Sequence, residues 1–173
     1  MKRTMAKEAT IRVAQGENPI AVLRKAHKEQ LLLCDQLEEI ADSLPDSVNR
    51  QKCIYAARAL GPMVRVLHRF EEDVVFPLFA ERLKEHEDIE ATLNRLKFEH
   101  CEDECFAEEL TEALHALGAN RPDINIEATG YMLRGFFEAM RRHIAFESEH
   151  LLSNETLTAA DLLFTDDTDR GPS

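Results

Sequence analysis

The chain has 173 residues, of which 44% are hydrophobic and 31% are charged, with only six glycines and six prolines. This length and composition are typical of one soluble globular domain, and they exclude a disordered chain and a turn-rich all-β fold. The formal net charge of −12 at pH 7 argues against binding along a nucleic-acid backbone and favours small ligands or metal cations.

The first predicted helix follows residues 1–17, which we expect to form a loose N-terminal arm. Asn18 is a favourable N-cap, and Pro19 fits the first turn of a helix. This helix should therefore begin at Pro19 and run to about Leu44, just before Pro45.

The second predicted helix begins near residues 46–47 and runs to about Leu83. Gly61 and Pro62 lie in its middle and Pro77 lies near its end, so we expect bends at these points. The apolar spacing continues through both prolines, which favours one interrupted helix over several separate ones.

The third predicted helix runs from about Asp88 to Leu117 and ends at Gly118, a residue typical of helix C-termini. The segment NRPD then breaks the chain before a fourth helix, predicted from about Ile124 to Leu152.

Four long amphipathic segments joined by short connections predict an all-α fold, an antiparallel up-down four-helix bundle. We expect the bundle to span residues 18–155 as one domain, followed by a C-terminal tail at 156–173. No apolar run approaches the ~20 residues of a membrane span. The opening residues also lack the apolar core of a signal peptide, so a cytoplasmic protein without membrane or nucleic-acid partners is expected.

Each predicted helix carries one histidine on its buried stripe, namely His27, His68, His100 and His143. A single histidine in this position is usually a hydrogen-bonded core residue. Two residues of an antiparallel hairpin face each other when they lie equally far from the connecting loop. The four histidines satisfy this condition to within about one helical turn, so the sequence predicts that they share one layer.

Three of these histidines have a glutamate four residues later, in the pairs His68 and Glu72, His100 and Glu104, and His143 and Glu147. This spacing places both members of a pair side by side on one helix. Buried carboxylates cost several kcal/mol each unless a positive charge compensates them. Imidazoles and carboxylates together suit iron, manganese or zinc.

Seven side-chain donors are too many for one tetrahedral zinc ion and fit two metal ions that share bridging carboxylates. We therefore predict two non-haem iron ions, with zinc or manganese as alternatives, held by His27, His68, Glu72, His100, Glu104, His143 and Glu147. Glu104 lies in the acidic run 102–104, so a solvated edge position is its alternative. His150 is an alternative ligand one layer further along, while His86 and His115 should be solvated.

The segments around these residues resemble the helices of a hemerythrin-like, HHE cation-binding domain: LRKAHKEQ around His27, HRFEEDVVFP at 68–77, FEHCEDE at 98–104 and HIAFESEHLL at 143–152. The resemblance covers roughly residues 18–155. It implies a di-iron centre in which His68 and His143 are terminal ligands, Glu72 and Glu147 bridge the metals, and His27 and His100 complete the set.

The chain departs from the oxygen-carrying members of that family at two positions. Glu104 stands where they have a second histidine, and Ser148 stands where they have an aspartate. These departures argue against reversible oxygen carriage.

Three functional hypotheses follow. The first is a di-iron protein that binds or senses oxygen, nitric oxide or peroxide, or that handles iron. The second is a di-iron oxidase or peroxide-consuming enzyme, and the third is a helical interaction module without metal. Self-association into a homo-oligomer is compatible with the sequence. The four cysteines are expected to be reduced. We expect Cys101 and Cys105 to be small buried residues, and a position near the metals or the helix interface is their alternative.

Overall fold

The computed structural model describes residue 11 and residues 17–153 of the chain. Our predictions for the C-terminal tail, and for all of the N-terminal arm except residues 11 and 17, lie outside the described residues. Within them, every regular element is helical, in agreement with the predicted fold class. None of the described helices is both long and apolar enough to cross a lipid bilayer.

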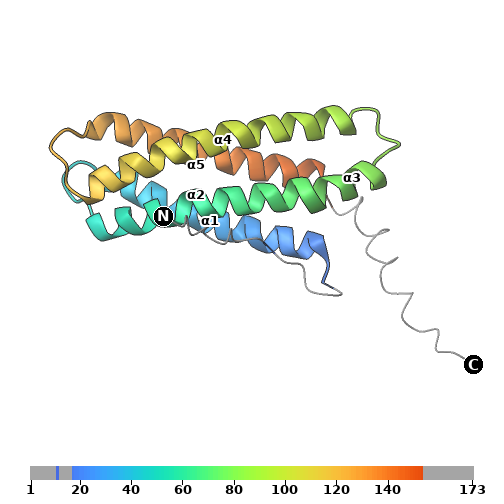
Figure 1. Cartoon of the computed structure of the whole chain (residues 1–173), viewed down its shortest axis with the longest axis horizontal. Helices are drawn as coiled ribbons and strands as arrows, with labels where there is room; N and C mark the ends of the chain where they lie inside the picture. The colour runs from blue at the N-terminus through green and yellow to red at the C-terminus, as the bar shows by residue number, and fades with distance from the viewer. Residues whose placement is uncertain (1–10, 12–16, 154–173) are drawn as a thin grey trace, which may run out of the picture.

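Four long helical rods run antiparallel to one another and form the predicted four-helix bundle (Figure 1). The elements in chain order are α1 (Pro19–Ser43), α2 (Arg50–Phe70), η1 (Glu71–Val75), α3 (Phe76–Arg82), α4 (Ile89–Gly118) and α5 (Ile126–His150). The second rod consists of α2, the single π-helical turn η1 and α3. Each rod packs against two others, since α1 contacts α2 and α5, and α4 contacts the same two helices.

Asparagine N-caps fix the starts of three helices. Asn18 Oδ1 accepts a hydrogen bond from the backbone N–H of Ile20 at 2.8 Å, and α1 begins at Pro19 as predicted. Asn49 and Asn125 cap α2 and α5 in the same way, at 3.1 Å and 2.9 Å. Because a side-chain acceptor satisfies an otherwise unpaired N–H, α2 begins at this cap, a few residues after its predicted start.

The second rod departs from α-helical geometry at η1, directly before Pro77, whereas Pro62 lies inside α2 without ending it. In η1 the backbone N–H of Phe76 bonds to the carbonyl oxygen of Glu71, five residues back. Pro77 has no N–H to donate into the preceding turn, and a wider turn accommodates this loss. Glu71 and Val75, the first and last residues of this turn, are both buried.

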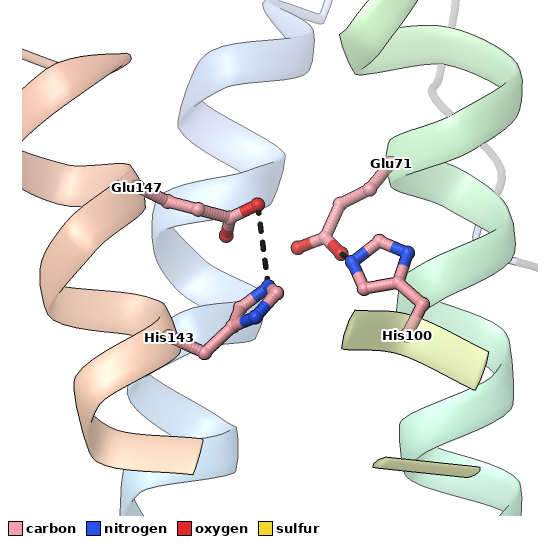
Figure 2. Close-up of side chains that lie close together, drawn as sticks. All are labelled: Glu71, His100, His143 and Glu147. Carbon is pink, nitrogen blue, oxygen red and sulfur yellow. Dashed lines mark ion pairs between the residues drawn. The ribbon is translucent and has the colours of Figure 1, made fainter. Parts of the chain in front are cut away.

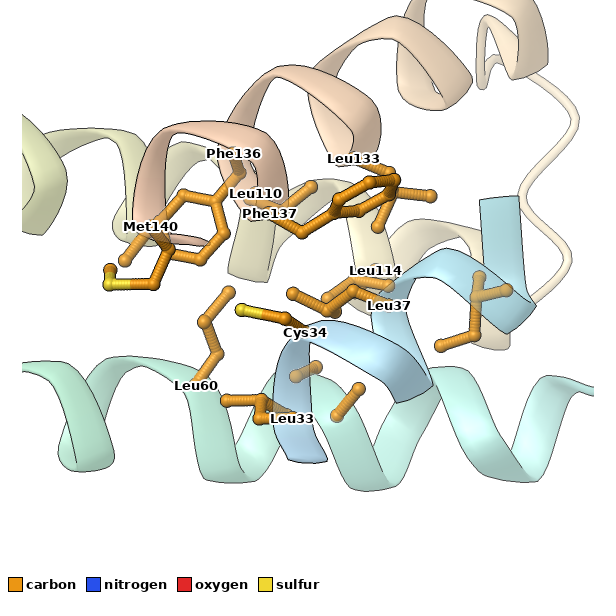
Figure 3. Close-up of a cluster of buried hydrophobic side chains, with 14 of the residues drawn as sticks. Leu33, Cys34, Leu37, Leu60, Leu110, Leu114, Leu133, Phe136, Phe137 and Met140 are labelled. Carbon is orange, nitrogen blue, oxygen red and sulfur yellow. The ribbon is translucent and has the colours of Figure 1, made fainter. Parts of the chain in front are cut away.

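The core of the bundle consists of two apolar clusters. One lies toward the loops at 44–49 and 119–125, and Figure 3 shows its side chains pointing toward one another, among them Leu37, Leu60 and Phe136. The other lies toward the loop at 83–88 and includes Phe76, Phe79 and Leu96. The buried polar side chains between these clusters are described below.

All four cysteines are free thiols. Cys34 and Cys53 are buried in the core, as small apolar residues often are. Cys101 and Cys105 are exposed on α4, so our prediction that they fill the interior is wrong. Their side chains lie on the outer face of α4, because His100 and Ala107 occupy the inward-facing positions of this part of the helix.

Two glycines provide a test of the packing. A Cβ at Gly118 would lie 2.6 Å from Ile54 Cγ1 and 3.1 Å from the carbonyl oxygen of Arg50, whereas at Gly130 its nearest neighbour would be 3.5 Å away. We expect Gly118→Ala to lower the free energy of unfolding by about 1–3 kcal/mol through overpacking. Gly130→Ala should raise it by about 0.5–1 kcal/mol, because alanine favours the helix. Urea unfolding measures both, and equal effects would contradict the close approach of α2 and α4.

Candidate metal centre

The four histidines predicted to share a layer come from four different helices and are all buried. The rings of His68 and His100 stack with a centroid distance of 3.9 Å and an interplanar angle of 6°. The ring of His143 lies 5.2 Å from that of His100. His27 joins this group through two carboxylates rather than through ring contacts.

Those two carboxylates belong to Glu71 and Glu147, and each side chain is almost completely buried. Glu71 Oε1 lies 3.3 Å from His27 Nε2, and its Oε2 lies 3.1 Å from His100 Nε2. Glu147 Oε2 lies 2.9 Å from His27 Nε2, and its Oε1 lies 3.5 Å from His143 Nε2. Each carboxylate therefore offers its two oxygens to two different imidazoles.

Figure 2 shows four of these side chains pointing into one space between the helices. Ligand atoms of Glu71, His100, His143 and Glu147 all lie within 4.8 Å of one another, and all four residues are buried. This spacing is suited to one or more metal ions, because each ion would contact nitrogen and oxygen donors from several helices at once.

The structure differs from the sequence prediction at Glu72. Glu71 occupies the buried position, whereas Glu72 Oε1 contacts His100 Nδ1 at 2.7 Å, on the outer side of the layer, with its side chain 36% exposed. Residues three and four positions apart are both neighbours on a helix, so the spacing from His68 allowed either glutamate. The structure buries Glu71, which lies at the junction of α2 and the π-helical turn η1.

Glu104 also lies on the outer side of the layer. Its Oε1 contacts His68 Nδ1 at 3.2 Å, across the interface between α2 and α4, and its side chain is 36% exposed. Glu99, which the sequence analysis did not select, makes the equivalent contact to His143 Nδ1 at 3.2 Å. Glu99 directly precedes His100, but no spacing within its own helix points to its partner, which lies on α5.

The remaining histidines lie away from the layer. His150 is exposed, and its ring meets the edge of Phe146 at a centroid distance of 4.3 Å, so it is outside the buried group. His86 and His115 are exposed, as expected from their positions near helix ends.

Several polar atoms of the layer lack hydrogen-bond partners although they are completely buried. They are Nε2 of His68, His100 and His143, Oε2 of Glu71 and both carboxylate oxygens of Glu147. Some lie within ion-pair distance of one another, but none makes a hydrogen bond. Unsatisfied buried polar atoms cost about 1–3 kcal/mol each, and more when they are charged. A cation bound among them would satisfy all of these atoms together, so the residues present fit a metal centre.

The electrostatics of the layer point to the same conclusion. Burial opposes protonation of His27, but the adjacent carboxylates of Glu147 and Glu71 outweigh it and raise its pKa to about 9. The pKa of His143 is likewise raised to about 9, because Glu147 and other carboxylates outweigh burial. Burial, together with the charges of His100 and His143, lowers the pKa of His68 to about 2. Without metal, protons on imidazoles therefore supply the positive charge that balances the carboxylates.

We expect metal uptake at pH 7 to release at least two protons, since His27 and His143 are protonated below a pKa of about 9 and ligands must be neutral. His100 adds to this release, because burial opposes its protonation but the carboxylates of Glu71 and Glu72 outweigh burial and raise its pKa. The release should shrink as the pH rises above about 9, where His27 and His143 are already neutral. Calorimetric zinc titrations in two buffers of different protonation enthalpy measure the proton count. Equal apparent heats in both buffers at pH 7 would contradict histidine ligation.

A surface groove of about 420 Å³ between α4 and α5 reaches the layer at His143. Glu99, Asp103 and Phe146 are among its lining residues, and burial raises the pKa of the Asp103 carboxyl. Small molecules and protons therefore have a short path from solvent to this histidine.

The comparison with protein families gives one match. A family model described as Hemerythrin HHE cation binding domain matches residues 18–153, a range that contains every side chain of the layer. The comparisons with curated proteins and with solved structures gave no match.

Proposed function

The chain belongs to the hemerythrin HHE cation-binding domain family, and on this basis we propose that its buried layer holds two non-haem iron ions at which a small ligand binds. Oxygen, nitric oxide and peroxide are the candidate ligands. The proposed ligand residues are His27, His68, Glu71, His100, His143 and Glu147.

The observation that carries this proposal is that each of the two buried carboxylates lies between two imidazoles. Both oxygens of Glu71 and both oxygens of Glu147 face imidazoles, and the two oxygens of each carboxylate face different imidazoles. A carboxylate between two nitrogen donors in this way is placed to bridge two ions. A single ion would leave some of these buried donors unsatisfied, which two ions avoid.

Imidazole and carboxylate donors suit iron, which we propose as the bound metal. Bound iron would supply an open coordination position and a redox couple. The protein supplies the enclosure, since the layer lies between two apolar clusters and the ring of Phe76 packs against that of His100 at 5.5 Å. An enclosed site of this kind favours small ligands, such as diatomic molecules, over large substrates.

A peroxide-consuming or oxidase activity is the second candidate, favoured by the groove at His143. Glu99 contacts His143 Nδ1 at 3.2 Å, and Asp103 Oδ2 lies 4.0 Å from the same nitrogen. These carboxylates are placed to carry protons between solvent and the layer, which turnover of peroxide requires and reversible binding does not.

The test begins with metal-free protein loaded with ferrous iron without oxygen. Elemental analysis should give about two iron ions per chain, and addition of oxygen or nitric oxide should produce new absorption bands that zinc-loaded protein lacks. Steady consumption of peroxide by the iron-loaded protein would instead favour the enzyme. A preparation that takes up no metal under any of these conditions would refute the proposal and favour the interaction module.

A further inference from the structure

Three imidazoles of the layer share one pattern of contacts. In each, Nδ1 meets a glutamate at the edge of the bundle: His68 meets Glu104 at 3.2 Å, His100 meets Glu72 at 2.7 Å, and His143 meets Glu99 at 3.2 Å. In each, Nε2 is buried and makes no hydrogen bond. The outer nitrogens are therefore paired with carboxylates, while the inner nitrogens face the proposed metal positions.

This pattern fixes where the proton of each neutral imidazole resides. A neutral imidazole has one N–H and one nitrogen lone pair, and an ionised carboxylate only accepts hydrogen bonds. In His68, the nitrogen that meets Glu104 must then carry the proton. In His100 and His143, Nε2 also lies near a buried carboxylate, at 3.1 Å from Glu71 and 3.5 Å from Glu147, so the proton stays on Nδ1 when a metal ion occupies Nε2. The other nitrogen, Nε2, keeps its lone pair for a metal ion.

We propose that Glu72, Glu99 and Glu104 are positioning residues that hold His100, His143 and His68 in the Nδ1–H tautomer with Nε2 directed inward. This inference rests on the proposed function, and it gives Glu72 and Glu104 a different role from the ligand role predicted from sequence. A carboxylate behind a ligating imidazole fixes its orientation and raises its basicity, and loss of such a partner typically weakens metal binding about 10–100-fold.

The positions of the three glutamates match this role. Their side chains are about one-third exposed, so they keep their charge in contact with solvent instead of entering the layer. Glu99 is itself oriented, because Arg95 Nε lies 3.0 Å from its Oε1 while its Oε2 faces His143. Arg95 in turn lies over the ring of Phe146, 4.4 Å from the centroid.

Helix α4 takes part in all three pairs. It contributes Glu104 to the histidine of α2, Glu99 to the histidine of α5, and His100 to the glutamate of η1. The pairs therefore link α4 to both neighbouring rods at the depth of the layer. Each link orients one donor, so the three effects on metal binding should be separable.

The test compares alanine and glutamine variants of Glu72, Glu99 and Glu104 with Glu109→Gln, an exposed glutamate of α4 that serves as the matched control. Zinc affinity is measured by competition with a chelator, and histidine tautomers are measured by ¹⁵N NMR of the diamagnetic zinc-loaded protein. We expect each alanine variant to lose about 10–100-fold in zinc affinity. Each glutamine variant should lose less, because its amide oxygen still accepts the hydrogen bond, and Glu109→Gln should bind as the wild type does.

The tautomer readout separates positioning from ligation. In the wild type the Nδ1–H signal should be present for all three histidines, and each alanine variant should change the signal of its own partner alone. Unchanged affinity with unchanged tautomers would overturn the proposal. A loss of zinc affinity far above 100-fold would also overturn it, because the glutamate would then be a direct ligand.

The same measurement on metal-free protein distinguishes this inference from the proposed function. His68 Nδ1 contacts Glu104 directly, at 3.2 Å, so the effect of this glutamate on the ring can be observed in metal-free protein. A wild-type protein that binds no metal would refute the proposed function. A His68 tautomer that does not respond to Glu104→Ala would refute the positioning role of that glutamate, whether or not metal binds.

Discussion

Glu147→Ala is expected to lower the iron bound per chain to less than about a tenth of the wild-type content, with a loss of affinity above about 100-fold. The two oxygens of Glu147 face His27 and His143, so the substitution removes one ligand from both of the proposed metal positions. It also removes negative charge from a site that must bind cations. Elemental analysis of protein loaded with ferrous iron and then desalted measures this content.

Glu149→Ala is the matched control, because Glu149 lies on the same helix two residues further along and is exposed. His115→Ala, at an exposed position on α4, serves as the histidine control beside His68→Ala. Both controls should retain the wild-type iron content, whereas His68→Ala should lose most of it. Equal iron in Glu147→Ala and Glu149→Ala would exclude the layer as the metal centre.

Metal loading is expected to raise the melting temperature by roughly 10 °C or more. A ligand present at about 1,000 times its dissociation constant stabilises the folded state by about 4 kcal/mol. The metal-free layer contains buried atoms without hydrogen bonds, and a bound cation would remove that penalty from the folded state alone.

Circular dichroism at 222 nm during heating, with and without a chelator, measures this stabilisation. The Glu147→Ala variant should melt at the same temperature in both conditions, because it lacks the binding site. Identical melting of the wild type with saturating zinc and with chelator would contradict the prediction.

The four-helix bundle and the shared layer of its histidines could be predicted from the sequence, because both depend on regular helix geometry. One histidine on each apolar stripe, at matching distances from the loops, is sufficient to place His68, His100 and His143 together. The asparagine caps were equally local, since Asn18 precedes Pro19 at the start of α1. Patterns that repeat every three or four residues survive small errors in helix bounds.

The roles of the individual glutamates could not be predicted from the sequence in the same way. The spacing from His68 allowed Glu71 or Glu72 and we selected Glu72, whereas the structure buries Glu71, the first residue of η1. Pro77 signalled an irregularity, and a bend was the simplest reading of it. Whether a helix bends or widens at a proline depends on tertiary packing, which no local pattern contains.

Contacts between side chains of different helices also could not be predicted from residue spacing within one helix. Glu104 lies four residues after His100 and was paired with it, yet its carboxylate meets His68 on another helix. Its orientation depends on how α2 and α4 face each other at that depth. Glu99 was missed for the same reason, because its partner His143 is 44 residues away in the chain.

The division of the apolar core into two clusters has a consequence for how the helices choose their axial alignment. Two leucine-rich faces can slide past each other by one turn, about 5.4 Å, and still bury similar areas. Here such a slip would place imidazoles and carboxylates opposite leucine and phenylalanine on both sides, at a cost of several kcal/mol. The buried imidazoles and carboxylates midway along the rods therefore favour one axial register of the helices over other registers that would bury similar apolar areas.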